Sequence, residues 1–287
     1  MAKIGIIGGS GLYQIEGLSA KRQLSVNTPF GKPSDDLVVG KLAGKEVVFL
    51  PRHGRGHRLN PSEINYRANI FAMKKLGVER IISVTACGSL RQQIKPLEFV
   101  LPDQFVDRTN QARKVTFFEN GIVAHISFAH PICGNLHSFL VQILEQLKIP
   151  FHKKGTYLCM EGPAFSTQAE SNLYRSWGMD IIGMTNISEA KLAREAEICY
   201  ATLAAVTDYD CWYEPAEPVT VEMVLTNLQK NVANAKKIIK EVIARLPLER
   251  DCSCSKALKD AIVTHPEFIP ISVKKKLNPL IGKYLKR

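Results

Sequence analysis

The sequence predicts an α/β fold in which helices surround a central, mixed but largely parallel sheet. Two observations support this prediction. Short apolar runs rich in β-branched residues alternate with amphipathic segments along the whole chain. No internal repeat, low-complexity tract or linker interrupts this alternation. We therefore expect a single domain over residues 1–287, with a helical tail over about residues 247–287.

The first predicted elements are strands. Residues 4–7 are apolar and β-branched and precede glycines, which indicates a buried strand entering a tight turn. Residues 37–42 and 46–50 are separated by three residues that include a glycine, a pattern typical of a hairpin. Residues 80–84 predict another buried strand, which we expect to end at Thr85.

A helix is predicted to begin at Asn60. Asn is a favoured capping residue, Pro61 suits the first helical position, and Glu63 suits the third. Apolar residues then recur at helical spacing up to Gly77, where we expect the helix to stop. The remaining predicted strands are residues 99–101, 122–126, 156–160 and 180–184, the remaining predicted helices are residues 135–147, 168–177, 188–196 and 219–246, and an apolar run over residues 198–207 leads directly into Asp208.

The composition is that of an ordinary globular protein, with 45% hydrophobic and 23% charged residues. No run of about 18 apolar residues is present, so we expect no membrane-spanning helix. The apolar stretch at the N-terminus is too short for a signal peptide, and we expect a cytoplasmic protein. The formal net charge is +11, but Lys and Arg are scattered outside the tail, which favours small anionic substrates over a nucleic-acid or membrane surface.

The chain has seven cysteines. An odd number without a signal peptide argues against a secreted disulfide framework. Cys252 and Cys254 are separated by one residue, whereas metal sites more often use a two-residue spacer and need further ligands. A redox pair, a structural disulfide and two unrelated thiols remain open for these cysteines, and we expect no metal ion.

A glycine-rich loop follows the first predicted strand, over residues 5–12. It fits a dinucleotide-binding fingerprint poorly, because Gln14 occupies the third glycine position and no second strand ends in an acidic residue at the expected distance. Glycines do let the backbone approach an anion, and Ser10 adds a hydroxyl donor. An anion-binding loop and a plain tight turn are equally compatible with these residues.

The densest basic cluster lies between Pro51 and Arg58, after a predicted strand. Arg52 offers a planar fork that suits phosphate oxygens, and His53 adds a further donor. A solvated basic loop is the alternative, but loops at the carboxyl ends of sheet strands are where ligands bind. Together with hydroxyls that follow other strands, the cluster forms a candidate oxyanion site of five residues: Ser10, Arg52, His53, Thr85 and Thr185.

Six segments of the chain resemble a known family. They are residues 8–12, 28–34, 52–54, 85–90, 161–167 and 207–212, which read GGSGL, TPFGKPS, RHG, TACGSL, EGPAFST and TDYDCW. Taken together, they resemble the 5′-methylthioadenosine phosphorylases of the trimeric-type purine nucleoside phosphorylase family. The likeness extends from about Lys3 to about Leu246, and the tail resembles prokaryotic members more than animal ones.

The resemblance implies a nucleoside phosphorylase fold and a pentosyltransferase activity with inorganic phosphate as co-substrate. The implied reaction converts 5′-methylthioadenosine into adenine and 5-methylthioribose 1-phosphate, in purine and methionine salvage. The resemblance also implies small-molecule substrates only, no cofactor and no metal ion. The implied assembly is a homotrimer, or a hexamer formed as a dimer of trimers.

Individual residues also receive roles from the resemblance. Phosphate contacts are implied for Ser10, Arg52, His53, Thr85, Ala86 and Thr185. Ribose and base contacts are implied for Ala86, Cys87, Gly88, Phe165, Ile182, Gly183 and Met184, with Asp208 and Asp210 at the purine and Val219, Val221, Val224 and Leu225 around the 5′ substituent. His125 is expected to contribute to the site of a neighbouring subunit. Gly183 replaces an Asn of animal members, so no side-chain contact is expected there, and Ser10 replaces a Thr and keeps the hydroxyl.

Asp208 is the candidate catalytic residue. Departure of the base requires a proton at N7 of the purine, which a protonated carboxyl can supply. Such a carboxyl matches adenine, which presents an acceptor at N7 and a donor at its 6-amino group, whereas a 6-oxopurine would suit an amide. We expect Asp210 to raise one of the two pKa values by like-charge repulsion. Bracing of a turn is the alternative role for Asp210.

Three other functions are weighed against this one. A 6-oxopurine or methylthioinosine phosphorylase is disfavoured by Asp208. A nucleotide- or RNA-binding module would exploit the net charge of +11 and predicts salt-sensitive oligonucleotide binding. A nicotinamide-dependent oxidoreductase is disfavoured by the missing third glycine. An apolar pocket around the 5′ substituent favours a methylthio group, although core packing remains the alternative for Val224 and Leu225.

Overall fold

The computed structural model describes residues 3–9, 12, 14–110, 112–213 and 220–285. The strands of this part of the chain are β1 (Lys3–Gly8), β2 (Ser19–Leu24), β3 (Leu37–Leu42), β4 (Lys45–Pro51), β5 (Val78–Ser89), β6 (Phe99–Val100), β7 (Gln104–Arg108), β8 (Phe151–His152), β9 (Thr156–Met160), β10 (Ile181–Gly183) and β11 (Cys199–Asp208). The helices are α1 (Tyr66–Lys75), α2 (Gly134–Leu147), α3 (Gln168–Ser176), α4 (Asn186–Glu195), α5 (Val221–Arg245), the 3₁₀ helices η2 (Ser253–Lys256) and η3 (Pro266–Phe268), and α6 (Ile271–Ile281).

All eleven described strands belong to one sheet, ordered β2-β3-β4-β1-β5-β10-β9-β7, with β11, β6 and β8 continuing from the other edge of β5. The central strand β5 is parallel to β1 and β11 and antiparallel to the short β10. β1 is also parallel to β4, and β9 is parallel to both β7 and β10. All residues of β11 are buried, as expected for a strand covered on both faces. The predicted mixed, largely parallel sheet is confirmed.

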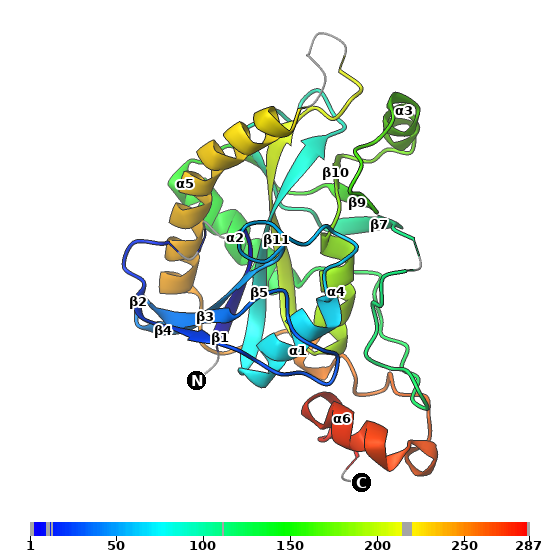
Figure 1. Ribbon diagram of the computed structural model, residues 1–287. Helices are drawn as coiled ribbons and strands as arrows, with labels where there is room; N and C mark the ends of the chain where they lie inside the picture. The colour runs from blue at the N-terminus through cyan, green and yellow to red at the C-terminus, as the bar shows by residue number, and fades with distance from the viewer. Residues whose placement is uncertain (1–2, 10–11, 13, 111, 214–219, 286–287) are drawn as a thin grey trace.

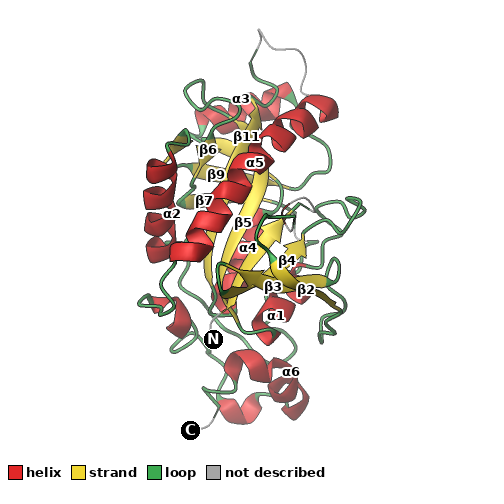
Figure 2. Ribbon diagram, turned by 90° about the vertical axis from the view of Figure 1, so that its left-hand side faces the viewer, coloured by secondary structure: helices red, strands yellow, loops and turns green. Residues whose placement is uncertain are grey.

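Helices cover both faces of this sheet. Figures 1 and 2 show α2 and α5 on one side and α1 and α4 on the other. α5 contacts α2 and β11, while α1 contacts α4. The inward face of α5 is apolar and fully buried at Ile238, Ile239, Val242 and Ile243, as the period of an amphipathic helix requires. In a sheet covered in this way, ligands bind at the carboxyl ends of the strands.

Most predicted elements are confirmed to within a few residues. β1, β3, β4, β9, α2, α3 and α5 lie where the sequence indicated them. The turn between β3 and β4 has φ of 49° at Ala43 and 77° at Gly44, the positive values that a type I′ hairpin turn requires. Gly77, with φ of 79°, follows the end of α1, where glycine commonly terminates a helix.

The predicted helix start at Asn60 is wrong. The side chain of Asn60 accepts hydrogen bonds from two backbone N–H groups of the following turn, but that turn is not continued. α1 begins at Tyr66, and Asn65 caps it by accepting from the N–H group three residues later. The amide of Asn65 also donates to the carbonyl of Phe30 at 2.7 Å, which holds this residue outside the helix. The capping residue Asn60 therefore stabilises one isolated turn and does not begin a helix.

The predicted strand over residues 122–126 is also wrong. Ala124 forms a single bridge with Ile262. The N–H of Val123 donates to Thr264 Oγ1 at 2.8 Å, and the carbonyl of Val123 accepts from Val263 at 2.9 Å. The segment pairs with the C-terminal tail and not with the sheet, so its pairing partner is distant in the sequence.

The strand predicted over residues 80–84 continues to Ser89 as part of β5. Thr85 and Gly88 therefore lie inside a strand and not in a loop that follows it. Pairing with β11 on one edge and β10 on the other supports this extension. The sequence analysis also missed β2, β7 and β8, because β2 is polar and exposed and β8 has only two residues.

The tail after Leu246 packs near the amino ends of β5 and β11. Lys283 and Tyr284 bond to the buried carboxylate of Glu197, which lies just before β11. Arg250 pairs with Glu79 at 2.9 Å. In Figure 1, α6 lies at the end of the molecule opposite to the first turns of α5. Among the described helices, none has the length and apolar character needed to cross a bilayer.

Candidate active site

Three neighbouring strands bring the predicted anion-binding segments together. β1 lies between β4 and β5, and its last residue, Gly8, pairs with Pro51. The backbone N–H of Arg52 donates to the carbonyl of Gly8 at 2.9 Å. Because β4, β1 and β5 are parallel, the basic loop, the glycine loop and Thr85 meet at the same edge of the sheet.

Arg52 is buried, and protein groups occupy most of its guanidinium. Its Nε donates to Glu189 Oε1 at 2.5 Å, and its Nη1 donates to the carbonyl of Val84 at 2.9 Å. Its Nη2 donates to Ser83 Oγ at 2.5 Å and to Glu189 Oε2 at 3.3 Å. Since a guanidinium carries five N–H groups, one Nη1 hydrogen remains for a ligand. Arg52 thus links β5 to α4. It can offer one N–H group to phosphate, whereas the sequence predicted a contact through the planar fork of the guanidinium.

Glu189 keeps Arg52 charged. Burial alone would lower the pKa of Arg52, but the Glu189 carboxylate raises it. Glu189 also accepts hydrogen bonds from Ser83 Oγ at 2.7 Å and from the Tyr200 hydroxyl at 2.8 Å. Sequence analysis missed Glu189, although an acidic residue four positions after Thr185, in the first turn of a helix, was an available signal.

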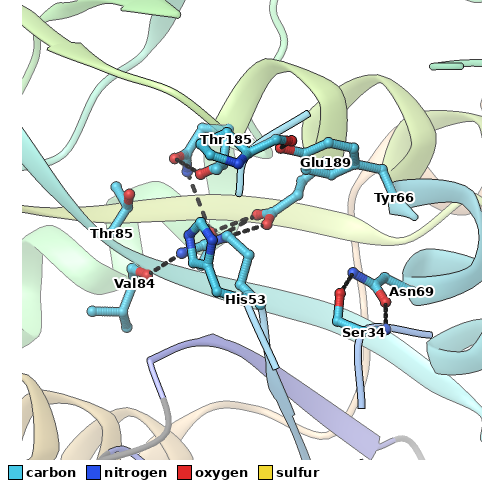
Figure 3. A network of polar contacts seen from close by, with 12 residues as sticks. Ser34, His53, Tyr66, Asn69, Val84, Thr85, Thr185 and Glu189 are labelled. Atoms are coloured by element: carbon cyan, nitrogen blue, oxygen red, sulfur yellow. Dashed lines mark hydrogen bonds and ion pairs between the residues drawn. The ribbon is translucent and has the colours of Figure 1, made fainter. Parts of the chain in front are cut away.

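Thr85 and Thr185 approach this network from β5 and from the start of α4 (Figure 3). Both are buried, with exposed fractions of 8% and 3%. Thr185 is the N-cap residue of α4, but its hydroxyl does not cap the helix. The first N–H groups of a helix have no intrahelical partner and carry partial positive charge. An anion beside Thr185 would therefore meet hydroxyl and N–H donors at one place.

His53 is half-buried and uncharged at neutral pH. Burial and the charge of Arg52 lower the pKa of His53 to about 4. Its Nδ1 lies 2.8 Å from the carbonyl of Leu59, and its ring stacks on that of His57 at 4.2 Å. A carbonyl only accepts, so Nδ1 carries the hydrogen and Nε2 of the neutral ring is an acceptor. Toward phosphate, His53 therefore accepts a hydrogen, where the sequence analysis expected a donor.

The predicted base-binding residues meet at the far end of β5. Gly88 pairs with Ile182 of β10 on one edge and with Asp208 of β11 on the other. A Cβ atom on Gly88 would lie 2.8 Å from Asp208 Oδ1 and 3.2 Å from a methyl group of Ile182. Glycine at this position keeps the space beside the carboxyl open. Ala86 and the buried Cys87 connect this end of β5 to Thr85.

Asp208 is 7% exposed, and burial raises the pKa of its carboxyl. Hydrogen bonds from Thr207 Oγ1 at 2.7 Å and from the N–H of Asp210 at 2.8 Å oppose this rise only in part. Burial also raises the pKa of Asp210, and the charge of Asp208 adds to the rise. The expected like-charge repulsion is therefore present, but burial is the larger cause.

Asp210 adopts a left-handed conformation, with φ of 53°. Its N–H donates to Asp208 Oδ1, which closes a turn of the Asx type on the carboxyl of the earlier residue. Bracing of a turn was the alternative role considered for Asp210. In the structure the carboxyl of Asp208 braces this turn. The side chain of Asp210 lies near Gly88, since a Cβ atom on Gly88 would be 3.4 Å from its Cβ.

Tyr157 occupies the place that a side chain at Gly183 would need. A Cβ atom on Gly183 would overlap the hydroxyl oxygen of Tyr157. Tyr157 is fully buried, and its hydroxyl makes no hydrogen bond of ordinary length to the described residues, although it interacts with the side chain of Thr85. A buried hydroxyl without a hydrogen bond of ordinary length is costly, so this group is suited to a polar atom of a ligand. Sequence analysis missed Tyr157, which it read as part of an apolar strand.

The loop that carries Phe165 packs beside the same end of the site. A Cβ atom on Gly162 would lie 2.5 Å from Met184 Sδ, so the loop lies directly on Met184. Cys211 Sγ contacts the carbonyl of Ser166 at 3.2 Å, which links the loop to the segment after β11. Phe165 itself is 47% exposed.

The first turns of α5 lie beside the end of β11. The amide of Asn227 donates to the carbonyl of Thr207 at 2.7 Å, one residue before Asp208. Val221 and Leu225 precede Asn227 on α5 and are 64% and 50% exposed. Leu225 is therefore not buried in the core of a single chain, and the core-packing alternative is wrong for this residue.

Several predicted site residues cannot be placed with the others. Ser10 and Val219 lie outside the described residues, and the side chain of Val224 is also outside the description. His125 is exposed, and its backbone N–H donates to the carbonyl of Ala261 in the tail at 2.8 Å. A contribution of His125 to a neighbouring subunit stays a prediction.

One group of described residues has ligands suited to a metal ion: Cys133, Cys199, Cys252 and Cys254. Cys199 is the first residue of β11 and Asp208 is its last, so this group lies at the other end of the strand from the predicted base-binding residues. The sequence analysis considered only the closely spaced pair and expected no metal ion, because the other two cysteines are remote in the sequence.

Comparison with known proteins identifies relatives over nearly the whole chain. The family model described as "Phosphorylase superfamily" matches residues 3–244. The S-methyl-5′-thioadenosine phosphorylase of Geobacter sulfurreducens is 57% identical over 282 residues, which cover 98% of this chain and 99% of the relative. The enzyme of the same name from Koribacter versatilis is 56% identical over 283 residues, which cover 99% of this chain and 97% of the relative.

Solved structures show the same likeness. A methylthioadenosine phosphorylase from an antarctic soil metagenomic library has a TM-score of 0.91 at 50% identity, covering 97% of this chain and 98% of that chain. The methylthioadenosine phosphorylase of Schistosoma mansoni in complex with adenine has a TM-score of 0.82 at 38% identity, covering 90% of this chain and 96% of that chain.

Proposed function

The chain belongs to the phosphorylase superfamily, and we propose that it is a pentosyltransferase that cleaves S-methyl-5′-thioadenosine with inorganic phosphate, giving adenine and 5-methylthioribose 1-phosphate. The observation that carries this proposal is a buried carboxyl with a raised pKa, Asp208, which lies against Gly88 on the strand that also carries Thr85. The names of relatives that are 56–57% identical support the same substrate.

The spacing along β5 fits a nucleoside with phosphate beneath it. Thr85 and Gly88 are three residues apart, which corresponds to roughly 10 Å along a strand. A ribose can span the space between a phosphate held near Thr85 and a base held near Gly88. Tyr157, whose buried hydroxyl lies beside Gly183, supplies a polar contact between these two ends.

Phosphate would bind at the start of α4. The hydroxyls of Thr85 and Thr185 and N–H groups in the first turn of the helix would donate to its oxygens, and Arg52 adds one N–H. Nε2 of His53 accepts the hydrogen of a protonated phosphate oxygen, which orients the unprotonated oxygens toward the sugar. Held beneath the anomeric carbon, the phosphate both attacks and stabilises the positive charge that develops on the ribose.

The base leaves as a neutral purine if N7 gains a proton. The raised pKa of Asp208 favours the protonated form of its carboxyl, whose proton can be donated to or shared with N7. The second oxygen of the carboxyl accepts from the 6-amino group of adenine. A 6-oxopurine presents acceptors at both positions, so a carboxyl suits it less well.

The 5′ substituent and the assembly complete the proposal. Val221 and Leu225 leave apolar surface exposed beside the end of β11, where it can cover a methylthio group. A homotrimer, or a hexamer formed as a dimer of trimers, would bring the exposed His125 to a neighbour's site. The full chain would act as one domain in the cytoplasm, on small-molecule substrates and without a cofactor. Light scattering of the purified protein tests the assembly.

Base selectivity tests the proposed function. Release of adenine from methylthioadenosine and of hypoxanthine from methylthioinosine is measured with and without phosphate. We expect strict phosphate dependence and a preference for methylthioadenosine. In Asp208→Asn, we expect kcat/KM for methylthioadenosine to fall about 10²–10⁴-fold, and kcat/KM for methylthioinosine to fall much less. Asp107→Asn, a change in a partly exposed carboxylate paired with Lys191, is the matched control.

Two outcomes would contradict this assignment. Equal losses for both substrates would show that Asp208 does not read the base. A wild-type enzyme that prefers methylthioinosine would support the 6-oxopurine phosphorylase considered from the sequence.

A further inference from the structure

We propose that Cys133, Cys199, Cys252 and Cys254 bind one Zn²⁺ ion as four thiolate ligands. Their Sγ atoms all lie within 4.8 Å of one another, and those of Cys199 and Cys252 are 3.3 Å apart. A tetrahedral site with Zn–S bonds of about 2.3 Å places its sulfur atoms about 3.8 Å apart. The separations of the four sulfur atoms, from 3.3 Å for Cys199 and Cys252 to no more than 4.8 Å, bracket the spacing of a tetrathiolate site.

Three separate segments hold these ligands in place. Cys133 is the N-cap residue of α2, where the helix dipole favours a thiolate. Its backbone N–H donates to the carbonyl of Tyr200 at 2.9 Å, which fixes the start of α2 beside Cys199 on β11. Cys252 precedes η2 and Cys254 lies within it. The main chain thus presents all four sulfurs to one point, without contributions from long flexible side chains.

The surroundings suit a closed structural site. Cys133, Cys199 and Cys254 are 3%, 1% and 7% exposed, and Cys252 is half-buried. A cavity of about 670 Å³, lined in part by Cys133, Cys252 and Cys254, gives an ion access to the cluster. Four cysteine ligands complete the tetrahedral coordination of zinc, so no position remains for a substrate. Thiolates also select zinc over harder ions such as magnesium.

Zinc at this point would connect the C-terminal tail to the body of the protein. Cys252 and Cys254 belong to the tail, whereas Cys199 begins β11 and Cys133 begins α2. No two of the seven cysteines are joined by a disulfide. A single ion would join all three segments, while a disulfide joins only two positions. The role we infer is structural, since metal binding to a preformed site stabilises the folded state.

Metal analysis of the whole protein tests this proposal. The chain is produced with zinc in the medium, purified without chelators, and its metal content is measured by mass spectrometry. We expect one zinc per chain in the wild type and at least tenfold less in Cys252→Ser/Cys254→Ser. Cys159→Ala removes another buried thiol, on β9, and is the matched control that should keep its zinc. Cobalt in place of zinc should give the intense visible absorption of a tetrahedral thiolate site.

A single substitution keeps the test decisive if the double variant does not fold. Cys252→Ser changes the most exposed of the four ligands and should weaken zinc binding in competition with a chromogenic chelator. The proposal is overturned if the reduced wild type takes up no Zn²⁺ in that competition. It is equally overturned if the freshly purified chain contains iron instead, or if its intact mass under non-reducing conditions is lower by two hydrogens for each disulfide formed among these cysteines.

Discussion

The two ends of β11 serve different purposes. Cys199 begins the strand and Asp208 ends it, about 30 Å away. At the Asp208 end lie polar groups suited to a ligand, including the buried hydroxyl of Tyr157 and the hydroxyl of Thr185, which does not cap α4. At the Cys199 end, four sulfur atoms face one another. We therefore propose that one end binds and converts a substrate, and that the other holds three segments together.

The two ends of helix α4 also differ, because each carries a buried glutamate with different partners. Glu189, in its first turn, is paired with the buried cation Arg52. Glu195, at its last position, accepts only from neutral groups, the N–H of Phe117 and the hydroxyl of Thr116. Burial raises the pKa of Glu195 to about 7, because the hydrogen bonds from Phe117 and Thr116 and the charge of Arg67 offset the loss of water around it only in part.

The largest expected effect on stability follows from breaking the Arg52–Glu189 pair. Glu189→Gln leaves the guanidinium of Arg52 buried without an opposite charge, and we expect the free energy of unfolding to fall by about 3–5 kcal/mol. Urea unfolding at pH 7, followed by circular dichroism, measures this change. The KM for phosphate should rise as well, because Arg52 and the start of α4 lose their fixed positions.

Glu195→Gln is the matched control on the same helix. Its amide oxygen can still accept from the N–H of Phe117, and a neutral side chain avoids the cost of ionising a buried carboxyl, so we expect no loss of stability at pH 7. Equal losses in the two variants would show that the charge of Arg52 has no special part in organising the phosphate end.

The sequence predicted the Asp208 end far better than the Cys199 end. Arg52, Thr85, Thr185 and Asp208 each follow an apolar run, so strand recognition was enough to predict them near strand ends. In the structure Thr85 lies inside β5, and the strand before Thr185, β10, is antiparallel to β5. The hydrogen bonds of Arg52 were not predictable, because Glu189 lies on a different element. The turn at residues 60–63 has the sequence of a helix start but is not continued as a helix. It was mispredicted because local capping residues do not show how the chain continues.

The cysteine cluster could not be read from local spacing. Its ligands come from α2, β11 and η2, and only one pair is close in the sequence. Their meeting depends on how the tail packs against the amino end of the sheet, which periodicity does not reveal. Strand 122–126 was mispredicted in the same region, where the tail supplies the pairing partner.

The next largest effect concerns pH and Glu195. Its folded pKa of about 7 lies above its ordinary value of 4.5, so the folded state binds more protons between these two values. Glu195 therefore stabilises the fold fully below pH 4.5, and this contribution is lost as pH rises toward 7; the expected loss is about 3 kcal/mol. Unfolding free energies at pH 5 and pH 8 measure it. The decline should be smaller in Glu195→Gln, and an identical decline would assign it to other groups.

Zinc removal should have a moderate effect, confined to the Cys199 end. With free zinc at 100 times its Kd, the ion stabilises the folded chain by about 2.7 kcal/mol, which corresponds to roughly 5 °C in Tm. Thermal unfolding with zinc and with an excess of chelator measures the difference. Turnover well below Tm should stay within about twofold, since the two ends are about 30 Å apart. A parallel loss of turnover would indicate coupling through Tyr200, which follows Cys199 and bonds to Glu189.

The smallest expected effect separates zinc from the other contacts that hold the tail. The hydroxyl of Tyr284 donates to the buried carboxylate of Glu197, which also accepts from the N–H of Leu258 at 3.2 Å and from Lys283 at 2.6 Å. Tyr284→Phe removes one of these three contacts and should lower the free energy of unfolding by about 1.5 kcal/mol, with turnover unchanged. The substitution is measured by urea unfolding of both the zinc-loaded and the zinc-free protein. If zinc and this hydrogen bond act independently, the two losses are equal; a larger loss without zinc shows that they hold the tail jointly. No loss in either form would mean that the other contacts of the tail hold it without this hydrogen bond, whether or not zinc is bound.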